Sequence, residues 1–144
     1  MKYSLGTDHA GIKVRDFIVE CFAKRGIELV DLSPRSEERV DYPDFAKKVC
    51  TQVLQNPDSR GILVCGSGIG MSISANRFKG TRAGLCTDAY MAKMTRAHND
   101  ANVLCMGERI SGLGEIESIL EAFVDTEFEG GRHQIRIQKI EEIG

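Results

Sequence analysis

The sequence predicts an α/β fold, a Rossmann-like three-layer α/β/α sandwich with a five-stranded parallel sheet. Two observations predict it. Apolar runs of strand length alternate with segments of helical period, and the third apolar run passes through a glycine-rich turn directly into a helical segment. Strands joined through intervening helices make right-handed crossovers, which produce a parallel sheet covered on both faces. In such sheets, ligands bind beyond the carboxyl ends of the strands.

Short apolar runs justify the strands, and the turn residues or polar segments around them set their bounds. In chain order the predicted strands are Lys2–Thr7, Ile27–Leu32, Gly61–Cys65, Thr81–Thr87 and Ala101–Met106.

Apolar residues at helical spacing justify the helices, and local signals mark several of their ends. Gly26 ends the first helix, Tyr42-Pro43-Asp44 opens the second, and Asn56-Pro57-Asp58 stops it. The last helix is expected to turn Ile137, Ile140 and Ile143 inward. In chain order the helices are expected at residues 11–25, 42–55, 71–78, 88–96, 113–124 and 131–143.

Size and composition indicate one domain spanning residues 1–144. A net charge of -2 argues against a general nucleic-acid binder, which normally carries a basic face. No apolar run approaches the roughly 20 residues that cross a membrane, and the start of the chain has no signal-peptide pattern. We therefore expect a cytoplasmic protein with neither nucleic-acid nor membrane partners. The five cysteines include no C-x-x-C pair, which favours reduced thiols over a disulfide framework or a zinc site.

The glycine-rich turn is the most informative stretch for function. Cys65 ends a predicted strand, and Gly66, Gly68 and Gly70 then alternate with Ser67 and Ile69. Glycines at a helix start leave peptide N–H groups uncovered, so this turn should stabilise negative charge. A thiol there should ionise readily, and an oxyanion formed beside it would be held. The spacing fits neither the dinucleotide fingerprint nor a Walker A loop, and it indicates chemistry on a small anionic substrate.

Polar residues gather at the ends of the predicted elements, and we expect those near strand ends to lie along a single rim. They are Asp8, His9, Tyr42, Cys65, Ser67, Asp88, His98 and Asn99. Structural roles stay open beside the functional ones. Asp8 is also a natural helix N-cap, and His98 is also favourable at a helix C-terminus. Arg132 and Arg136 share a helix face next to His133, either as a solvated surface or as a phosphate clamp.

A family resemblance adds to this reading and covers nearly the whole chain. Six motifs, in order, resemble type B ribose-5-phosphate isomerase, whose family also holds galactose-6-phosphate isomerase subunits and allose-6-phosphate isomerases. The motifs are Asp8-His9-Ala-Gly, Glu38-Arg39-Val-Asp41-Tyr42-Pro43, Gly61-Ile-Leu-Val-Cys-Gly-Ser-Gly-Ile-Gly70, Ser74-Ala-Asn76-Arg, His98-Asn99-Asp100-x-Asn102-Val-Leu and Glu129-Gly-Gly-Arg-His-Gln-x-Arg136.

The resemblance implies interconversion of D-ribose 5-phosphate and D-ribulose 5-phosphate through an enediolate, as in the pentose phosphate pathway, with no metal and no organic cofactor. Cys65 matches the base of the cysteine-using members. Other members use a glutamate just after the glycine turn, where this chain has Met71, so the resemblance assigns the base role to Cys65. Ser67 stands where many members have threonine and keeps the hydroxyl. His98 matches the residue that opens the furanose ring by proton transfer.

The remaining matches are binding positions and contacts between subunits. The family's dimers have sites at the subunit interface, so some groups should come from the partner, and the helix at 131–143 should contact it; a tetramer is also open. Two other functions stay open: isomerisation of a six-carbon sugar phosphate, and non-catalytic binding of a sugar phosphate. The matched binding residues are Asp8, His9, Tyr42, Gly66, Ser67, Gly68, Ile69, Gly70, Asn99, Arg109, Arg132 and Arg136.

Overall fold

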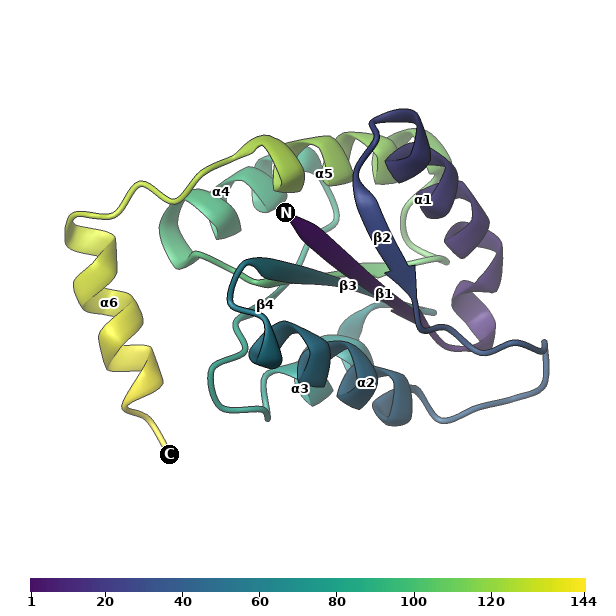
Figure 1. Ribbon diagram of the computed structural model, residues 1–144, viewed down its shortest axis with the longest axis horizontal. Coiled ribbons are helices and arrows are strands. Elements are labelled where there is room, and N and C mark those ends of the chain that lie inside the picture. The colour runs from purple at the N-terminus through teal and green to yellow at the C-terminus, as the bar shows by residue number, and fades with distance from the viewer.

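A sheet of five parallel strands runs through the centre of the molecule (Figure 1). This computed structural model describes residues 1–144, and its strand order is β2-β1-β3-β5-β4. The predicted five-stranded parallel sheet is therefore confirmed. The strands are β1 (Lys2–Thr7), β2 (Glu28–Asp31), β3 (Ser59–Cys65), β4 (Ala83–Leu85) and β5 (Val103–Gly107).

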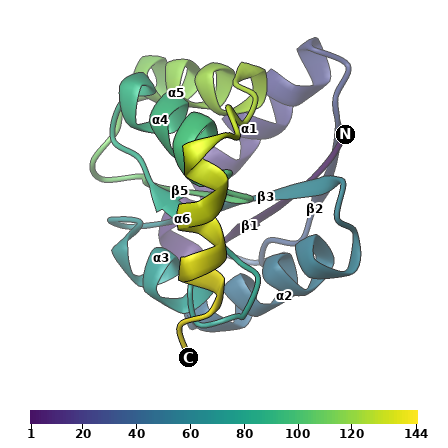
Figure 2. The same cartoon turned by 90° about the vertical axis from the view of Figure 1, so that its left-hand side faces the viewer.

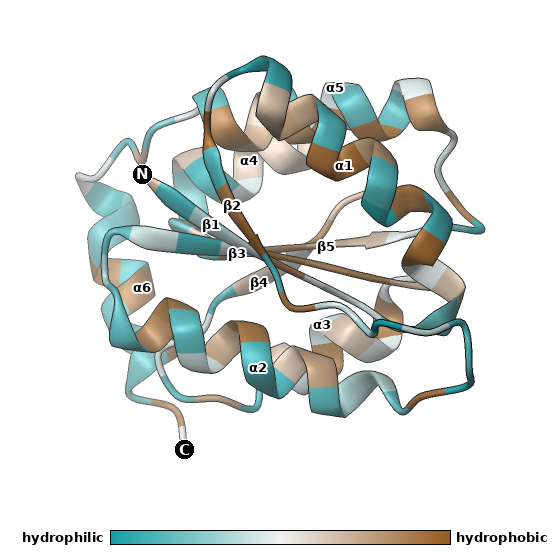
Figure 3. Cartoon of the chain, turned by 45° about the vertical axis from the view of Figure 1, so that its right-hand side comes forward, coloured by the Kyte–Doolittle hydropathy of each residue, from teal (hydrophilic) through white to brown (hydrophobic).

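Helices cover both faces of the sheet, so the predicted three-layer arrangement is confirmed as well (Figure 1). One face carries α1 (Ile12–Lys24), α4 (Ala89–Asn99) and α5 (Leu113–Asp125), and the other carries α2 (Tyr42–Gln55) and α3 (Ile69–Ala75). Apolar and polar stretches alternate along these helices (Figure 3), as expected when one side of each helix packs on a sheet. No helix is both long enough and apolar enough to traverse a lipid bilayer.

Two apolar layers, one on each side of the sheet, form the core. The larger layer joins strand residues such as Leu5 and Ile62 to Phe22 of α1 and Phe123 of α5. On the other side α2 lies unusually close to the sheet. A Cβ added to Gly61 would come within 2.5 Å of the side chain of Val49, so glycine in β3 permits this approach.

Several predicted boundaries differ from the observed ones for local reasons. The fourth strand is only Ala83–Leu85, because the N–H groups of Arg82 and Ala83 donate to the side-chain oxygens of Asn102 and Asn76 at its start, and the chain leaves the sheet before Asp88. The third helix begins at Ile69 rather than Met71, because Gly68 takes a left-handed conformation with φ of +81° and turns the chain directly into it. Gly26, with φ of +66°, ends the α1 region as predicted.

The last helix, α6 (Arg132–Glu141), stands apart from the three layers and packs mainly against α4 (Figures 1 and 2). The prediction that three isoleucines face inward is correct only for Ile137. Ile140 is 46 % exposed and Ile143 is 79 % exposed, because α6 has too few neighbours to cover both sides. A hollow of about 630 Å³ remains between the end of α6 and the segment 76–83.

Candidate active site

The carboxyl end of β3 carries Cys65 and the turn that follows it. Cys65 is buried, and its Sγ accepts a hydrogen bond from the N–H of Gly68 at 3.2 Å. A hydrogen bond donated to sulfur favours the form that carries negative charge. The left-handed conformation of Gly68 makes this contact possible, because it folds the chain back over the sulfur.

Several peptide N–H groups that follow Cys65 in the chain have no acceptor. The N–H groups of Gly66, Ser67, Gly70 and Met71 donate to no acceptor within the chain. The N–H of Ile69, in contrast, donates to Ser67 Oγ at 3.2 Å. Unused donors clustered beside a thiol are what an oxyanion or a phosphate would accept from. Helix α3 has only seven residues, so the donors themselves, rather than a long helix dipole, provide this stabilisation.

Neighbouring strands and helices hold the turn in place. The N–H of Arg109 donates to the carbonyl of Gly66 at 2.9 Å, and the Arg109 guanidinium lies against the same glycine. A Cβ added to Gly70 would come within 2.6 Å of the Tyr42 ring, so this ring packs directly on the turn from the other side. Gly107 is equally close, since its added Cβ would meet the backbone of Ser67 at 2.5 Å. Substitution at Gly70 or Gly107 would therefore force the turn or the residues packed on it to shift.

Asp8 and His9 follow β1, the strand beside β3, and lie at the same edge of the sheet. Asp8 Oδ1 accepts from the N–H groups of Ala10 at 2.9 Å and Gly11 at 3.2 Å, so Asp8 caps the short 3-10 helix His9–Gly11. It does not cap α1 itself, which was the prediction, because the 3-10 turn comes first and Gly11 takes the N-cap position of α1. His9 Nδ1 accepts from the N–H of Val40 at 3.2 Å. Neutral imidazole that accepts at Nδ1 carries its proton on Nε2, which makes His9 a hydrogen-bond donor.

The other four cysteines are in less favourable surroundings for proton transfer. Burial raises the pKa of Cys50 to about 11 and that of Cys86 to about 12. Burial also raises the pKa of Cys105 well above its usual value, and it raises that of Cys21. Only the sulfur of Cys65 accepts a peptide N–H. The glycine turn thus distinguishes one thiol from the rest, as the sequence predicted.

The expectation of a single rim is wrong for His98 and Asn99. Helix α4 starts near the carboxyl edge and runs back, so its last residues lie at the amino edge, just before β5. Cys65 pairs with Gly107 at one end of β5, whereas His98 and Asn99 come before Val103 at the other. The four residue steps from Val103 to Gly107 alone span about 13 Å. Within one chain, His98 and Asn99 do not reach Cys65.

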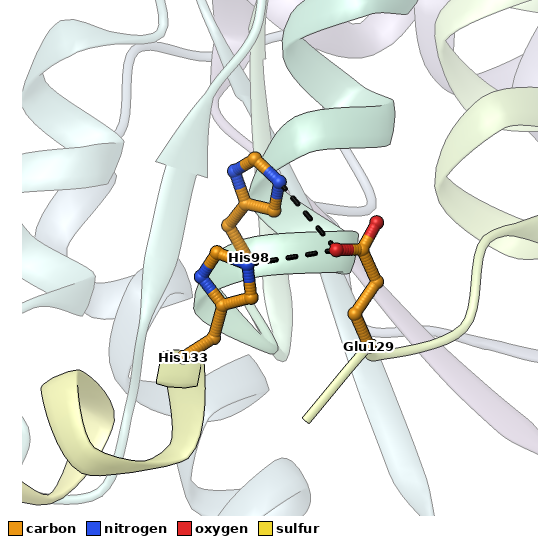
Figure 4. A group of neighbouring side chains, drawn as sticks. All are labelled: His98, Glu129 and His133. Atoms are coloured by element: carbon orange, nitrogen blue, oxygen red, sulfur yellow. Dashed lines mark ion pairs between the residues drawn. The ribbon is translucent and has the colours of Figure 1, made fainter. Parts of the chain in front are cut away.

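The amino edge collects a second set of predicted residues around His98. Its ring stacks on that of His133, with centroids 4.2 Å apart and planes 12° from parallel. Glu129 Oε1 lies 3.8 Å from His98 Nε2 and 3.5 Å from His133 Nε2 (Figure 4). Arg132 and Arg136 are exposed on the same helix as His133.

The predicted residues therefore fall into two groups. The group at the carboxyl edge is Asp8, His9, Tyr42, Cys65, Gly66, Ser67, Gly68, Ile69, Gly70 and Arg109. The group at the amino edge is His98, Asn99, Arg132 and Arg136. The sequence analysis did not place Glu129 or the ring of His133 beside His98. The one signal for them is their spacing of four residues across Gly130-Gly131, which sequence alone does not connect to His98.

Comparisons with known proteins agree with this fold. Residues 4–140 match the sequence model of the family described as Ribose/Galactose Isomerase. Ribose-5-phosphate isomerase B of Escherichia coli is 42% identical over 139 residues, covering 96% of this chain and 93% of the relative. Ribose-5-P isomerase B of Listeria innocua is 38% identical over 143 residues, covering 99% and 97%.

Solved structures match over the same extent. The structure of Clostridium thermocellum ribose-5-phosphate isomerase B superposes with a TM-score of 0.96 at 46% identity, covering 99% of this chain and 96% of that one. The structure of Mycoplasma genitalium ribose-5-phosphate isomerase B with bound ribulose-5-phosphate has a TM-score of 0.94 at 39% identity, covering 96% and 93%.

Replacing Cys65 tests whether its sulfur acts as the base that takes a proton from a sugar-phosphate substrate. Cys65→Ala should lower turnover by at least about 100-fold, since a positioned proton-transfer group contributes roughly 100- to 10,000-fold. Circular dichroism should show an unchanged fold. Cys21→Ser is the matched control, because Cys21 is half-buried and far from the glycine turn, and it should keep the full rate. A Cys65→Ala protein with wild-type turnover would remove this residue from the mechanism.

The stacked histidines predict acid sensitivity. Burial, the neighbouring His98 and the Arg132 charge lower the pKa of His133. A histidine with a lowered folded-state pKa stabilises the fold fully above its unfolded pKa of about 6.5, and this contribution is lost as pH falls through the folded value. Urea unfolding at fixed protein concentration should therefore show a larger loss of stability between pH 7 and pH 5 in the wild type than in His133→Phe. Equal losses would contradict this assignment.

Proposed function

The chain belongs to the ribose/galactose isomerase family, and we propose that it interconverts D-ribose 5-phosphate and D-ribulose 5-phosphate with Cys65 as the base. One observation carries the proposal: the Cys65 sulfur accepts the Gly68 N–H inside a turn whose other N–H groups are largely unused. A base and a set of oxyanion donors are what abstraction of a proton next to a carbonyl requires.

The proton transfers follow from this placement. The Cys65 thiolate removes the proton on C2 of the open-chain aldose, the C–H electrons form the C1–C2 double bond, and the carbonyl oxygen O1 gains the negative charge. The unpaired N–H groups of the glycine turn stabilise this enediolate. The Ser67 hydroxyl lies within the turn and moves a proton from O2 to O1. Return of the proton from Cys65 to C1 gives the ketose and restores the thiolate.

Phosphate and sugar binding need groups from both edges of the sheet. His9 and Arg109 supply donors at the carboxyl edge, while Arg132 and Arg136 supply two guanidiniums on α6 at the amino edge. Because the two edges lie apart in one chain, the complete site is assembled from the carboxyl edge of one subunit and the amino edge of another. A two-fold dimer would contain two such sites.

Exposed apolar residues beside the glycine turn support this assembly. They project from α3, from the first turn of α4 and from the segment that joins β5 to the start of α5, all at or near the carboxyl edge. Apolar side chains grouped in this way mark a surface that another molecule covers. Here a second copy is the occupant that brings His98, Arg132 and Arg136 to Cys65. The exposed residues are Ile69, Ile73, Tyr90, Met91, Ile110 and Leu113.

Substrate turnover in D₂O tests the proposed reaction. Ribose 5-phosphate should yield ribulose 5-phosphate that carries deuterium at C1, because the enediolate takes its proton from a base that exchanges with solvent. The value of kcat/KM for ribose 5-phosphate should exceed that for allose 6-phosphate by about 10-fold or more, since one extra carbon unit typically changes discrimination by 10- to 200-fold. A preference for allose 6-phosphate would identify a six-carbon isomerase. Binding without any exchange would identify a sugar-phosphate-binding protein.

A further inference from the structure

We propose that Glu129 and His133 are positioning residues that hold the His98 ring for opening of the furanose. This inference rests on the proposed function, in which His98 transfers the ring-opening proton. The trio comes from three parts of the chain: the last turn of α4, the loop after α5 and the first turn of α6 (Figure 4). None of its contacts involves the glycine turn at Cys65.

The backbone brings both Glu129 and His133 to His98. The N–H of Glu129 donates to the carbonyl of Ala97 at 3.0 Å, which fixes the loop against the last turn of α4. Gly130 and Gly131 then adopt positive φ values of +70° and +58°, a region that residues with a side chain rarely occupy. This reversal starts α6 at once and returns His133 to the Glu129 carboxylate, four residues on.

The two histidines have different surroundings. His133 is 5 % exposed and forms an inner ring, whereas the side chain of His98 is 38 % exposed and forms an outer ring. One face of the His98 imidazole is therefore covered by a parallel ring 4.2 Å away, and its Nε2 edge faces a carboxylate. These contacts limit rotation of His98 and leave part of its surface open to a substrate held by the partner.

One possible ligand atom from each of His98, Glu129 and His133 lies within 4.8 Å of the others, which is close enough to suggest a metal site. A histidine binds a metal along the nitrogen lone pair, which lies in the ring plane. Here the planes are only 12° from parallel, so the two lone pairs run side by side and do not converge on one point. The arrangement suits a held imidazole better than a coordination site.

The chemistry of ring opening uses such an arrangement. His98 takes the proton of the anomeric hydroxyl, the C1=O1 double bond forms as the bond from C1 to the ring oxygen breaks, and His98 returns a proton to that oxygen. Glu129 stabilises the imidazolium that exists between these transfers. The pKa of His133 is lowered by burial, by His98 and by Arg132, so its ring stays neutral at pH 7 and adds no competing charge.

A comparison of two reactions isolates this role. Ribulose 5-phosphate cannot form a five-membered ring, because its C5 oxygen is esterified, so deuterium exchange at its C1 needs the Cys65 base but no ring opening. Glu129→Gln should slow turnover of ribose 5-phosphate about 10-fold, a fraction of what a full proton-transfer group contributes, and leave exchange at C1 of ribulose 5-phosphate within about two-fold of wild type. Glu127→Gln is the matched control, because Glu127 is exposed in the same loop and makes no ion pair.

Two variants of His133 test the contribution of its stacked ring. His133→Phe keeps an aromatic ring against His98 and should retain ribose 5-phosphate turnover to within about three-fold, whereas His133→Ala should lose about 10-fold, again with exchange preserved. Wild-type turnover of ribose 5-phosphate in Glu129→Gln would overturn the inference, as would an equal loss of turnover and exchange. If the wild-type protein itself catalysed neither reaction, the proposed function would fail instead.

Discussion

The alternation of parallel strands and returning helices is the constraint on which the rest of the structure depends. Each strand delivers its last residue to the carboxyl edge of the sheet, and each following helix brings the chain back to the amino edge. Residues that end strands and residues that end helices are therefore separated by the length of the sheet. Cys65 belongs to the first kind and His98 to the second, so the topology itself divides the proposed site between two edges.

The chemistry at the carboxyl edge depends on a turn whose backbone N–H groups are not covered by side chains. Gly66, Gly68 and Gly70 carry no side chains, so the N–H groups around Cys65 remain open, and Gly107 lets the neighbouring strand end pack against Ser67. Tyr42 and Arg109 close the sides of the turn without occupying its donors. The result is a thiol next to preorganised donors, an arrangement that needs no reorganisation when negative charge develops on a substrate.

Much of this was predictable from the sequence, because local patterns specify local structure. The alternation of apolar runs and helical periods gave the sheet and its layers, and the glycine turn after Cys65 identified the thiol that differs from the other four. The single rim was wrong because His98 was assigned by its place before the next strand, although the start of a parallel strand lies at the opposite edge. The prediction that Ile140 and Ile143 face inward was wrong, because helical spacing indicates which residues share a face but not whether another element covers that face.

Long-range placement is what sequence alone left out. Glu129 and His133 join His98 only through the positive φ angles of Gly130 and Gly131 and the hydrogen bond to Ala97. Neither a period nor a spacing encodes that meeting. The same holds for the division of the proposed site between two subunits: the motifs follow one another in the chain, but no residue count reveals which of them must come from a partner.

Co-expression of two inactive variants that carry different affinity tags tests most directly whether the site is shared between two subunits. Chains with Cys65→Ala and chains with His98→Ala should each form inactive dimers. A mixed dimer contains one site in which Cys65 of one chain meets His98 of the other, so random pairing should restore about a quarter of wild-type activity per chain. Purified mixed dimers with no activity, in a protein whose wild-type form is active, would contradict a site built across two copies.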